Sequence, residues 1–275
     1  MALSDQELRR RLDSQQWTSH NIRLSDAVTT MPGQPDFMET DLRLKAILRA
    51  VSLLFRNDFS GLRVADLGCL EGGFALALAT HGMEVTGIEA RWKNLEKIEL
   101  LKEHFGCPNL TFKLDDVKNF DVEQYGSHDV VLALGILYHL DDPVAWLRQI
   151  SRATHALLVV DSHYAPSDDT GLAKIDERLK LGPITPIKDG ENLYEGRWFF
   201  EFDLMADREE QLWASYSNHR SFWLTKESLL KATTRAGFDL VLEQHDYSVN
   251  SYKDLTTTFP RTMLLAIKSD GFRRR

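Results

Sequence analysis

The sequence of 275 residues predicts an α/β fold: a doubly wound, mostly parallel sheet that ends in an antiparallel C-terminal edge pair. Three observations predict it. Short apolar runs alternate with stretches of helical periodicity from residue 62 to residue 161. A glycine-rich turn follows the first of these runs. Two strand-like runs close the chain with no helical pattern between them, which is typical of antiparallel neighbours.

The predicted elements follow one another in a regular order. Each strand is a short, nearly continuous apolar run, as expected where helices cover both faces of a parallel sheet. The predicted strands cover residues 62–67, 84–89, 110–114, 128–135, 156–161, 240–249 and 263–267. Apolar spacing, capping residues and terminating glycines predict helices from Ser4, over 41–55, from 74 to Gly82, over 92–104, from Asp142 and over 225–236.

The alternation of strands and helices breaks between residues 165 and 220, where charges, turns and clustered aromatic residues take over. This break predicts an insertion that caps a substrate site. Residues 1–60 precede the first strand and contain two helical patterns, which predicts an N-terminal helical extension or lid. The main domain is then expected over residues 61–275, with the cap insertion inside it at about 165–220.

Composition excludes several classes of protein. The formal net charge of −8 argues against a protein that holds long nucleic acid through its phosphates. The two cysteines, Cys69 and Cys107, make neither a disulfide framework nor a zinc set, so a reducing, cytoplasmic environment is expected. The chain has no run of about 18 apolar residues and no apolar leader at its charged N-terminus, so no membrane association is expected.

The glycine-rich turn runs from Asp66 to Gly73 and reads Asp-Leu-Gly-Cys-Leu-Glu-Gly-Gly. A strand, a glycine turn and a helix let backbone N–H groups approach a ligand, either a dinucleotide or S-adenosylmethionine. Leu70 stands where the dinucleotide fingerprint requires its middle glycine. The carboxylate of Asp66 would repel a pyrophosphate but attract the ammonium group of a methionine moiety. The turn therefore favours S-adenosylmethionine.

Further cofactor residues are expected where the later strands end. Glu89 ends the second strand, where its carboxylate can accept hydrogen bonds from both ribose hydroxyls. Asp116 and Val117 follow the third strand and can hold an adenine by its exocyclic amine and an apolar contact. The complete predicted cofactor set is Asp66, Gly68, Cys69, Gly72, Glu89, Ala90, Asp115, Asp116, Val117, Leu134, Gly135 and Tyr138.

These segments resemble, in order and spacing, the motifs of class I S-adenosylmethionine-dependent methyltransferases. The resemblance rests on 66–73, Glu89, 115–117 and 135–140 (Gly-Ile-Leu-Tyr-His-Leu), and covers roughly residues 60 to 270. It implies the class I methyltransferase fold, S-adenosylmethionine as cofactor and S-adenosylhomocysteine as product. The departure is Leu70, in place of the middle glycine of the family's commonest loop.

A narrower resemblance concerns residues 17–30. This segment is similar to one that precedes the methyltransferase domain in relatives of the enzymes that modify the tRNA wobble uridine. Thr18, Ser19 and Ala27 depart from that pattern. The similarity indicates a subfamily and does not identify a substrate.

His139 is the candidate general base, because it follows the fourth strand at the carboxyl edge of the sheet, where ligands bind in open α/β folds. Such a base is needed only where the nucleophile keeps its proton until attack. The alternative is that His139 packs at the start of the next helix. Cys69 is expected to pack rather than to react. No metal is predicted, because the spacing of His139, Glu201 and His219 matches no ligand pattern.

Substrate contacts are expected from the N-terminal segment, from the end of the fifth strand and from the aromatic part of the insertion. Alternative readings are a solvated loop for His163, and core packing or a dimer surface for Phe199 and Phe200. The predicted substrate residues are Trp17, His20, His163, Tyr164, Arg197, Trp198, Glu201, His219 and Trp223.

The function predicted from the sequence is transfer of a methyl group from S-adenosylmethionine to an oxygen or nitrogen of a small molecule. One alternative is a tRNA wobble-uridine-type methyltransferase, against which the acidic balance counts. Another is a non-catalytic S-adenosylmethionine-binding protein. A homodimer is also among the expected assemblies.

Overall fold

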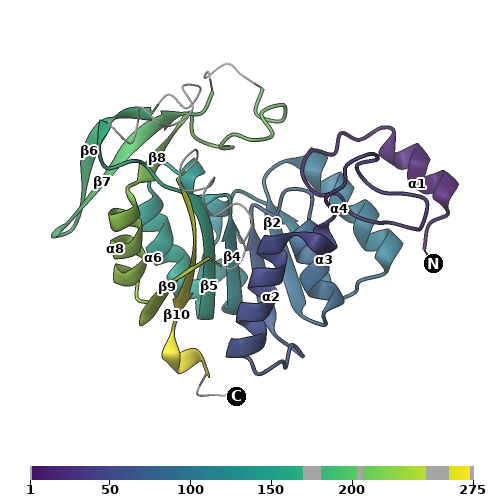
Figure 1. Cartoon of the computed structure of the whole chain (residues 1–275), viewed down its shortest axis with the longest axis horizontal. Helices are drawn as coiled ribbons and strands as arrows, with labels where there is room; N and C mark the ends of the chain where they lie inside the picture. Colours follow the sequence, from purple (N-terminus) through teal and green to yellow (C-terminus); the bar gives the residue numbers. More distant parts are fainter. Residues whose placement is uncertain (1, 170–180, 203–206, 246–259, 273–275) are drawn as a thin grey trace. The chain divides into compact units, whose positions relative to one another are not determined.

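The structure is a computed structural model that describes residues 2–169, 181–202, 207–245 and 260–272. The chain forms two compact units, Met1–Val117 and Lys118–Arg275 (Figure 1). The larger sheet has the strand order β3-β2-β1-β4-β5-β10-β9. The predicted mostly parallel sheet with antiparallel C-terminal strands is therefore confirmed.

The first unit contains three parallel strands with β2 in the middle. The strands are β1 (Arg63–Leu67), β2 (Glu84–Glu89) and β3 (Leu110–Leu114). β2 pairs in parallel with both neighbours, with Val85 opposite Val64 on one side and Leu110 on the other. The helices are α1 (Asp5–Leu12), α2 (Leu42–Leu54), α3 (Gly73–Thr80) and α4 (Trp92–Phe105), with a 3-10 turn η1 (Met38–Thr40).

Local sequence signals set the ends of these helices. The Ser4 hydroxyl accepts the backbone N–H of Glu7 at the start of α1, as the capping spacing predicted. Asp41 caps α2 by accepting the N–H groups of Arg43 and Leu44. α4 ends at Gly106, whose φ of 62° lies in the left-handed region that favours glycine.

The second unit contains a parallel pair of strands, β4 and β5, and two further strands that are joined by antiparallel pairing. β4 (His128–Leu134) and β5 (Thr154–His163) run parallel, and β10 (Arg261–Ile267) runs antiparallel to both β5 and β9 (Leu240–Gln244). The part of the predicted strand 240–249 beyond residue 245 lies outside the described residues. The helices are α5 (Val122–Tyr125), α6 (Pro143–Ala153) and α8 (Lys226–Arg235), with 3-10 turns η2 (Val117–Asn119), η3 (Leu137–His139) and η4 (Ser269–Phe272).

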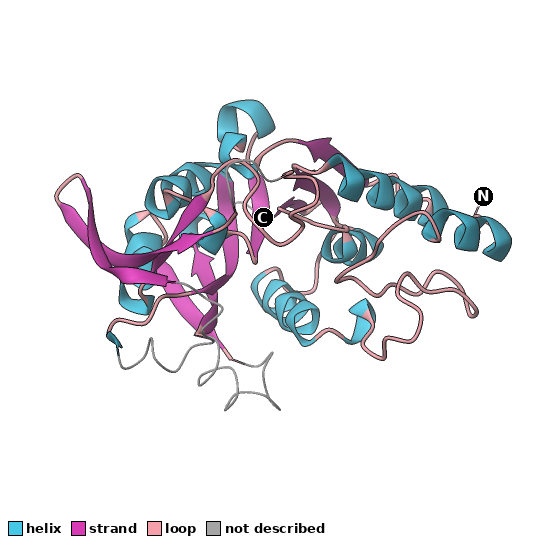
Figure 2. Cartoon of the chain, turned by 90° about the horizontal axis from the view of Figure 1, so that it is seen from above, coloured by secondary structure: helices cyan, strands magenta, loops and turns pink. Residues whose placement is uncertain are grey.

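A second, smaller sheet lies in the region predicted to be an insertion. β6 (Leu181–Asp189), β7 (Asn192–Phe200) and β8 (Arg220–Leu224) pair antiparallel, and Figure 2 shows the β6–β7 hairpin as a long pair of magenta arrows. The sequence did not predict these strands. Pro183 and Pro186 interrupt the β pattern of β6, and prolines within sheets are tolerated at edges, where β6 lies.

Candidate functional site

The loop between β1 and α3 folds tightly against β2. Gly68, Leu70 and Gly72 all have positive φ, at 68°, 51° and 74°. The N–H groups of Gly68 and Cys69 donate to the carbonyl of Ile88, at 2.9 and 3.1 Å. Leu70 N–H donates to the Glu89 carboxylate at 2.9 Å.

The next N–H groups of the loop are also engaged within the protein. Gly72 N–H donates to the carbonyl of Cys69 at 2.8 Å, and Gly73 N–H donates to Nδ1 of His20 at 3.0 Å. These N–H groups therefore hold the loop against β2 and His20. An N–H that already donates within the protein is a poor donor for a pyrophosphate.

Asp66, at the end of β1, has a buried carboxylate oxygen that suits a cation. Its side chain is buried, and its Oδ2 atom has no hydrogen-bond partner among the described residues. Burial raises the pKa of this carboxyl to about 7, and the nearby charge of Glu89 adds to the effect. A ligand ammonium at this oxygen would supply the missing donor and favour ionisation. The donor set therefore fits the methionine moiety of S-adenosylmethionine.

Glu89 and the residues after β3 have the polarity expected beside a nucleoside. Glu89 is buried, and its two oxygens accept N–H groups from Leu70 and Arg91 at 2.9 Å each. A carboxylate oxygen can accept a second hydrogen bond, so hydroxyl groups fit here as well. Asp116 is half-buried and donates its N–H to Oδ1 of Asp115, whereas Val117 is buried.

Cys69 has the environment of a packing residue. It is buried, and a Cβ atom placed on Gly87 of β2 would lie 2.9 Å from its Sγ atom. Burial raises the pKa of the thiol well above its usual value, which disfavours the nucleophilic thiolate.

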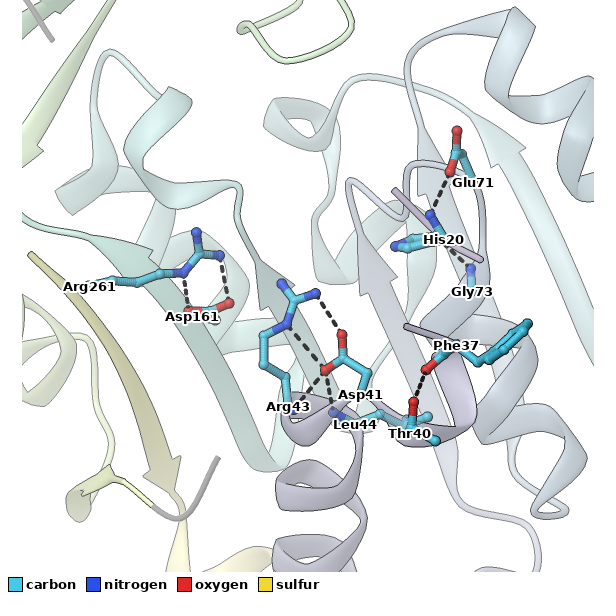
Figure 3. Close-up of polar contacts among 10 residues, drawn as sticks. All are labelled: His20, Phe37, Thr40, Asp41, Arg43, Leu44, Glu71, Gly73, Asp161 and Arg261. Atoms are coloured by element: carbon cyan, nitrogen blue, oxygen red, sulfur yellow. Dashed lines mark hydrogen bonds and ion pairs between the residues drawn. The ribbon is translucent and has the colours of Figure 1, made fainter. Parts of the chain in front are cut away.

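The N-terminal segment contacts this loop directly (Figure 3). His20 is buried, and Nδ1 of its ring accepts the Gly73 N–H. The Glu71 carboxylate accepts the backbone N–H groups of Thr18, Ser19 and His20. Sequence reasoning missed Glu71; the signal was a charged residue among the small residues of the turn.

In the second unit, the structure brings together two predicted residues that lie far apart in the sequence. Nδ1 of His139 lies 2.9 and 3.1 Å from the two oxygens of Glu201. The Glu201 side chain is 1% exposed and that of His139 is 14% exposed. Nδ1 donates in this bond because a carboxylate only accepts, so the neutral form of the ring has its lone pair on Nε2.

Neighbouring residues hold both members of this dyad in place. Glu201 also accepts the backbone N–H of Ser215 at 3.1 Å. The amide of Asn218 donates to the carbonyls of His139 and Arg220, at 3.0 and 2.7 Å. The ring nitrogen of His139 that faces away from Glu201 is thereby left in a defined orientation, as a general base requires.

Aromatic rings surround the dyad. The Tyr138 ring lies 4.3 Å from that of His139, 4.7 Å from that of His163 and 5.5 Å from that of Trp223, between centroids. His163 and Trp223 stack with an interplanar angle of 9°, and Phe199 lies 5.2 Å from Trp223. This cluster combines flat apolar surfaces with one proton acceptor.

His163 is held in one tautomer and is therefore a poor candidate base. Its Nδ1 lies 3.3 Å from the carbonyl of Pro260, and its Nε2 lies 3.2 Å from Nη1 of Arg261. Burial, and then the charge of Arg261, lower the pKa of His163 to about 4. Arg261 in turn pairs with Asp161 through two bonds of 2.7 Å (Figure 3). The sequence analysis missed both members of that ion pair.

Gly135 follows β4 and turns the chain next to the cluster. Its φ is 73°, and its N–H donates to the carbonyl of Asp161 at 2.8 Å. A Cβ atom placed here would lie 3.5 Å from the Tyr138 hydroxyl and 3.7 Å from Nη2 of Arg261. Leu134 directly precedes this glycine and is half-buried.

Arg197 has a structural environment that the sequence did not suggest. The residue is fully buried, and its guanidinium donates to the carbonyls of Pro166 and Gly182 and to the carboxylate of Asp169. These partners tie together segments on both sides of residues 170–180. The guanidinium therefore stabilises the small sheet through these three acceptors.

The remaining predicted substrate residues are dispersed. The Trp198 ring stacks under the guanidinium of Arg220 at 4.2 Å, and Lys226 lies 5.7 Å from the Tyr164 ring. His219 contributes its carbonyl, which accepts the Glu201 N–H at 2.9 Å. Trp17 lies in the first unit, where Nζ of Lys97 is 5.6 Å from its ring.

The described residues contain neither a metal-binding cluster nor a helix suited to crossing a membrane. No group of three or more histidine, cysteine, aspartate or glutamate side chains in the described part of the chain has a metal-binding arrangement. Among the described helices, none has both the length and the apolar character that crossing a bilayer requires.

A family profile described as a methyltransferase domain matches residues 38–243. Among curated proteins, a ubiquinone biosynthesis O-methyltransferase of Xanthomonas oryzae pv. oryzae is 32% identical over 97 residues, which are 35% of this chain and 40% of the relative. A tRNA U34 carboxymethyltransferase of Campylobacter hominis is 26% identical over 187 residues, 62% of this chain and 61% of the relative. The chain thus spans about two fifths of the first relative and three fifths of the second.

Solved structures share the fold over nearly the whole chain. The N-terminal domain of EvdMO1 with bound S-adenosylhomocysteine aligns with a TM-score of 0.70 and 24% identity, covering 97% of this chain and 98% of that chain. Another structure of that domain was determined in the presence of S-adenosylhomocysteine and D-fucose. ChlM of Synechocystis PCC 6803 with bound S-adenosylmethionine aligns with a TM-score of 0.52 and 17% identity, covering 87% of each chain.

Proposed function

The chain belongs to the methyltransferase-domain family, with S-adenosylmethionine as the methyl donor, and we propose that it methylates a hydroxyl oxygen of a small molecule with His139 as general base. The observation that carries this proposal is the contact between Nδ1 of His139 and the Glu201 carboxylate. A histidine arranged in this way is needed for a nucleophile that keeps its proton until attack, and a hydroxyl is such a nucleophile.

The first unit supports the donor side of the proposal. Asp66 presents a buried oxygen without a partner among the described residues, which suits the ammonium of the methionine moiety. Glu89 suits the ribose hydroxyls, and Asp116 with Val117 suits the adenine. The bound donor supplies an electrophilic methyl group on a sulfonium, and its sulfide leaves without needing an acid.

The second unit supports the acceptor side. Nε2 of His139 takes the hydroxyl proton as the oxygen forms its bond to the methyl carbon. Glu201 stabilises the imidazolium that results, and its burial strengthens this electrostatic effect. Ser215 and Asn218 keep the pair aligned while the proton moves.

The aromatic cluster supports a compact ring as the acceptor. Tyr138 and Phe199 are half-buried, and their flat faces suit packing against either an aromatic ring or the apolar face of a sugar. The names of the similar proteins agree in class, since one relative is a ubiquinone biosynthesis O-methyltransferase and one structure was determined with D-fucose present.

Methylation at the tRNA wobble uridine is the second candidate. The Campylobacter hominis match favours it, because that match covers 62% of this chain, compared with 35% for the O-methyltransferase relative. The net charge of −8 opposes it, since tRNA binding relies on a basic surface. A gel-shift titration with unmodified tRNA separates the two, because the small-molecule proposal expects no binding at 150 mM salt.

Calorimetry and turnover test the main proposal. The wild-type chain is expected to bind S-adenosylhomocysteine, and Asp66→Ala and Glu89→Ala to bind it more weakly. A panel of phenols, catechols and sugars with S-adenosylmethionine then identifies acceptors by S-adenosylhomocysteine release. His139→Ala should lower turnover of an accepted substrate by about 10²- to 10⁴-fold while binding of the donor persists.

Three results would contradict it. Full turnover in His139→Ala would show that His139 is not the general base. An absence of donor binding would contradict the assignment of S-adenosylmethionine as the methyl donor. Donor binding without turnover of any hydroxylated acceptor would favour the non-catalytic alternative.

The proposal also includes a division of the chain into an extension, a main domain and a cap, and a cellular location. We assign residues 1–60 to an N-terminal extension and about 165–220 to a cap within the main domain. A cytoplasmic location agrees with two cysteines that are both free and buried. A homodimer stays a prediction that sedimentation analysis tests.

A further inference from the structure

Residues 17–20 and the glycine-rich loop hold each other through reciprocal hydrogen bonds, which we call the N-terminal latch. We propose that Glu71 and His20 are positioning residues for the cofactor, so that closure of the N-terminal latch and binding of S-adenosylmethionine favour each other. This inference rests on the proposed function, because it concerns the same cofactor site.

The first half of the N-terminal latch is the Glu71 carboxylate, which is fully buried. It accepts the backbone N–H groups of three successive residues, Thr18 at 2.6 Å, Ser19 at 3.1 Å and His20 at 2.8 Å. Nζ of Lys97 lies 2.9 Å from the same carboxylate and compensates its charge. Three donors from one stretch of chain fix both the position and the direction of that stretch.

In the second half of the N-terminal latch the glycine-rich loop is the donor, and His20 is the acceptor. α3 begins after Gly72, which has no side chain with which to cap the helix. The ring of His20 supplies the missing acceptor, 3.0 Å from the Gly73 N–H. A Cβ atom on Gly73 would lie 2.8 Å from that ring, and the ring also packs edge-on against Phe74. The helix start and the His20 ring are therefore shaped for each other.

The loop needs such support because its backbone is strained. Leu70 has a φ of 51°, a conformation that residues with a Cβ atom adopt only when their surroundings impose it. Asp66 and Glu89, which face the proposed cofactor, flank this loop on β1 and β2. A loop already held in the bound shape loses less conformational entropy when a ligand arrives. Opening the N-terminal latch should therefore weaken cofactor binding without touching the acceptor chemistry.

The test compares three variants of the full chain by titration with S-adenosylhomocysteine. His20→Ala removes the acceptor for Gly73, whereas His20→Asn keeps an acceptor oxygen close to the position of Nδ1. Ile47→Ala, in the fully buried core of α2, is a control for general destabilisation. His20→Ala should bind S-adenosylhomocysteine about 10- to 100-fold more weakly. His20→Asn should stay within about threefold of wild type, and Ile47→Ala should lose thermal stability but not affinity.

Two further measurements separate positioning from a merely structural role. The KM for S-adenosylmethionine should rise with the Kd in His20→Ala, while kcat at saturating donor should stay near the wild-type value. Hydrogen exchange at the amides of residues 18–20 should slow when S-adenosylhomocysteine binds the wild-type chain, but not when it binds Glu71→Gln.

Wild-type affinity in His20→Ala would overturn the inference, as would equal losses in His20→Ala, His20→Asn and Ile47→Ala. Failure of the wild-type chain to bind S-adenosylhomocysteine would instead overturn the proposed function, and the inference with it. Normal binding by the wild type therefore separates the two failures.

Discussion

Asp161 on β5 and Arg261 on β10 form an ion pair with two hydrogen bonds of 2.7 Å, and the Asp161 side chain is fully buried. The same guanidinium reaches Nε2 of His163 at 3.2 Å and lies 6.0 Å from the Tyr138 ring centroid. One arginine therefore connects the end of the central strands with the aromatic cluster beside the proposed base.

Arg261→Met should destabilise the protein, because it leaves the Asp161 carboxylate buried without its charge partner. The expected loss in free energy of unfolding is about 3–5 kcal/mol, measured by urea denaturation at pH 7.5. The double variant Asp161→Leu/Arg261→Met should recover most of that loss, since it removes both charges. A loss below about 1 kcal/mol in the single variant would mean that the carboxylate is solvated in the native state.

Cofactor affinity should depend on pH through Asp66. Its pKa of about 7 means that the carboxyl is largely protonated below pH 7, and only the ionised form attracts an ammonium. Affinity for S-adenosylhomocysteine should therefore be full above the pKa of the free protein and fall as the pH drops below it, by up to tenfold per pH unit. Binding at pH 6.5 should also release a proton.

Calorimetry between pH 5.5 and 7.5, in buffers of different ionisation enthalpy, measures both effects. Asp66→Asn is the matched control, because it keeps the shape of the side chain and cannot titrate. It should bind more weakly at pH 7.5 and show no pH dependence in this range. An unchanged pH dependence in Asp66→Asn would assign the effect to another group.

Glu201→Gln tests how the dyad works. The variant keeps an oxygen that can accept from Nδ1 of His139 but loses the charge that stabilises the imidazolium. It also brings an amide N–H₂ group to a site where the carboxylate now accepts the Ser215 N–H. We expect kcat to fall by about 10- to 100-fold, the pH–rate profile to shift to lower pH because the imidazolium loses its stabilising charge, and the Kd for S-adenosylhomocysteine to stay the same. An unshifted profile would count against Glu201 as a partner in proton transfer.

Arg197 should matter for stability and not for substrate binding. Arg197→Met leaves the carbonyls of Pro166 and Gly182 without their charged donor, at a cost of about 3 kcal/mol by thermal or urea unfolding. Arg197→Lys should recover part of this, because an ammonium can reach only some of the acceptors. If the variant instead had a raised KM for the acceptor and unchanged stability, Arg197 would be assigned a role in substrate binding.

The sequence was sufficient to predict functional residues that lie at the ends of strands. Asp66 and Glu89 end apolar strands, and strand ends were visible in the periodicity. It predicted His139 as a base but not its contact with Glu201, because the two are 62 residues apart and only the folded chain joins them. Asp161 and Arg261 were missed for the same reason.

The small sheet was missed for a local reason. β7 alternates buried and exposed residues only in part, and Arg197, a charged residue, occupies a fully buried position in it. A buried arginine contradicts the pattern by which a strand is recognised. Its burial is acceptable only because three acceptors from other segments surround it, and no sequence pattern reveals them.

The bonds from Arg197 to the carbonyls of Pro166 and Gly182 also have a consequence for a chain that has been cut. One side chain binds two carbonyls that lie 16 residues apart in the sequence (182 minus 166). A single cleavage of the backbone between Pro166 and Gly182 would therefore leave both stretches attached to Arg197 by hydrogen bonds.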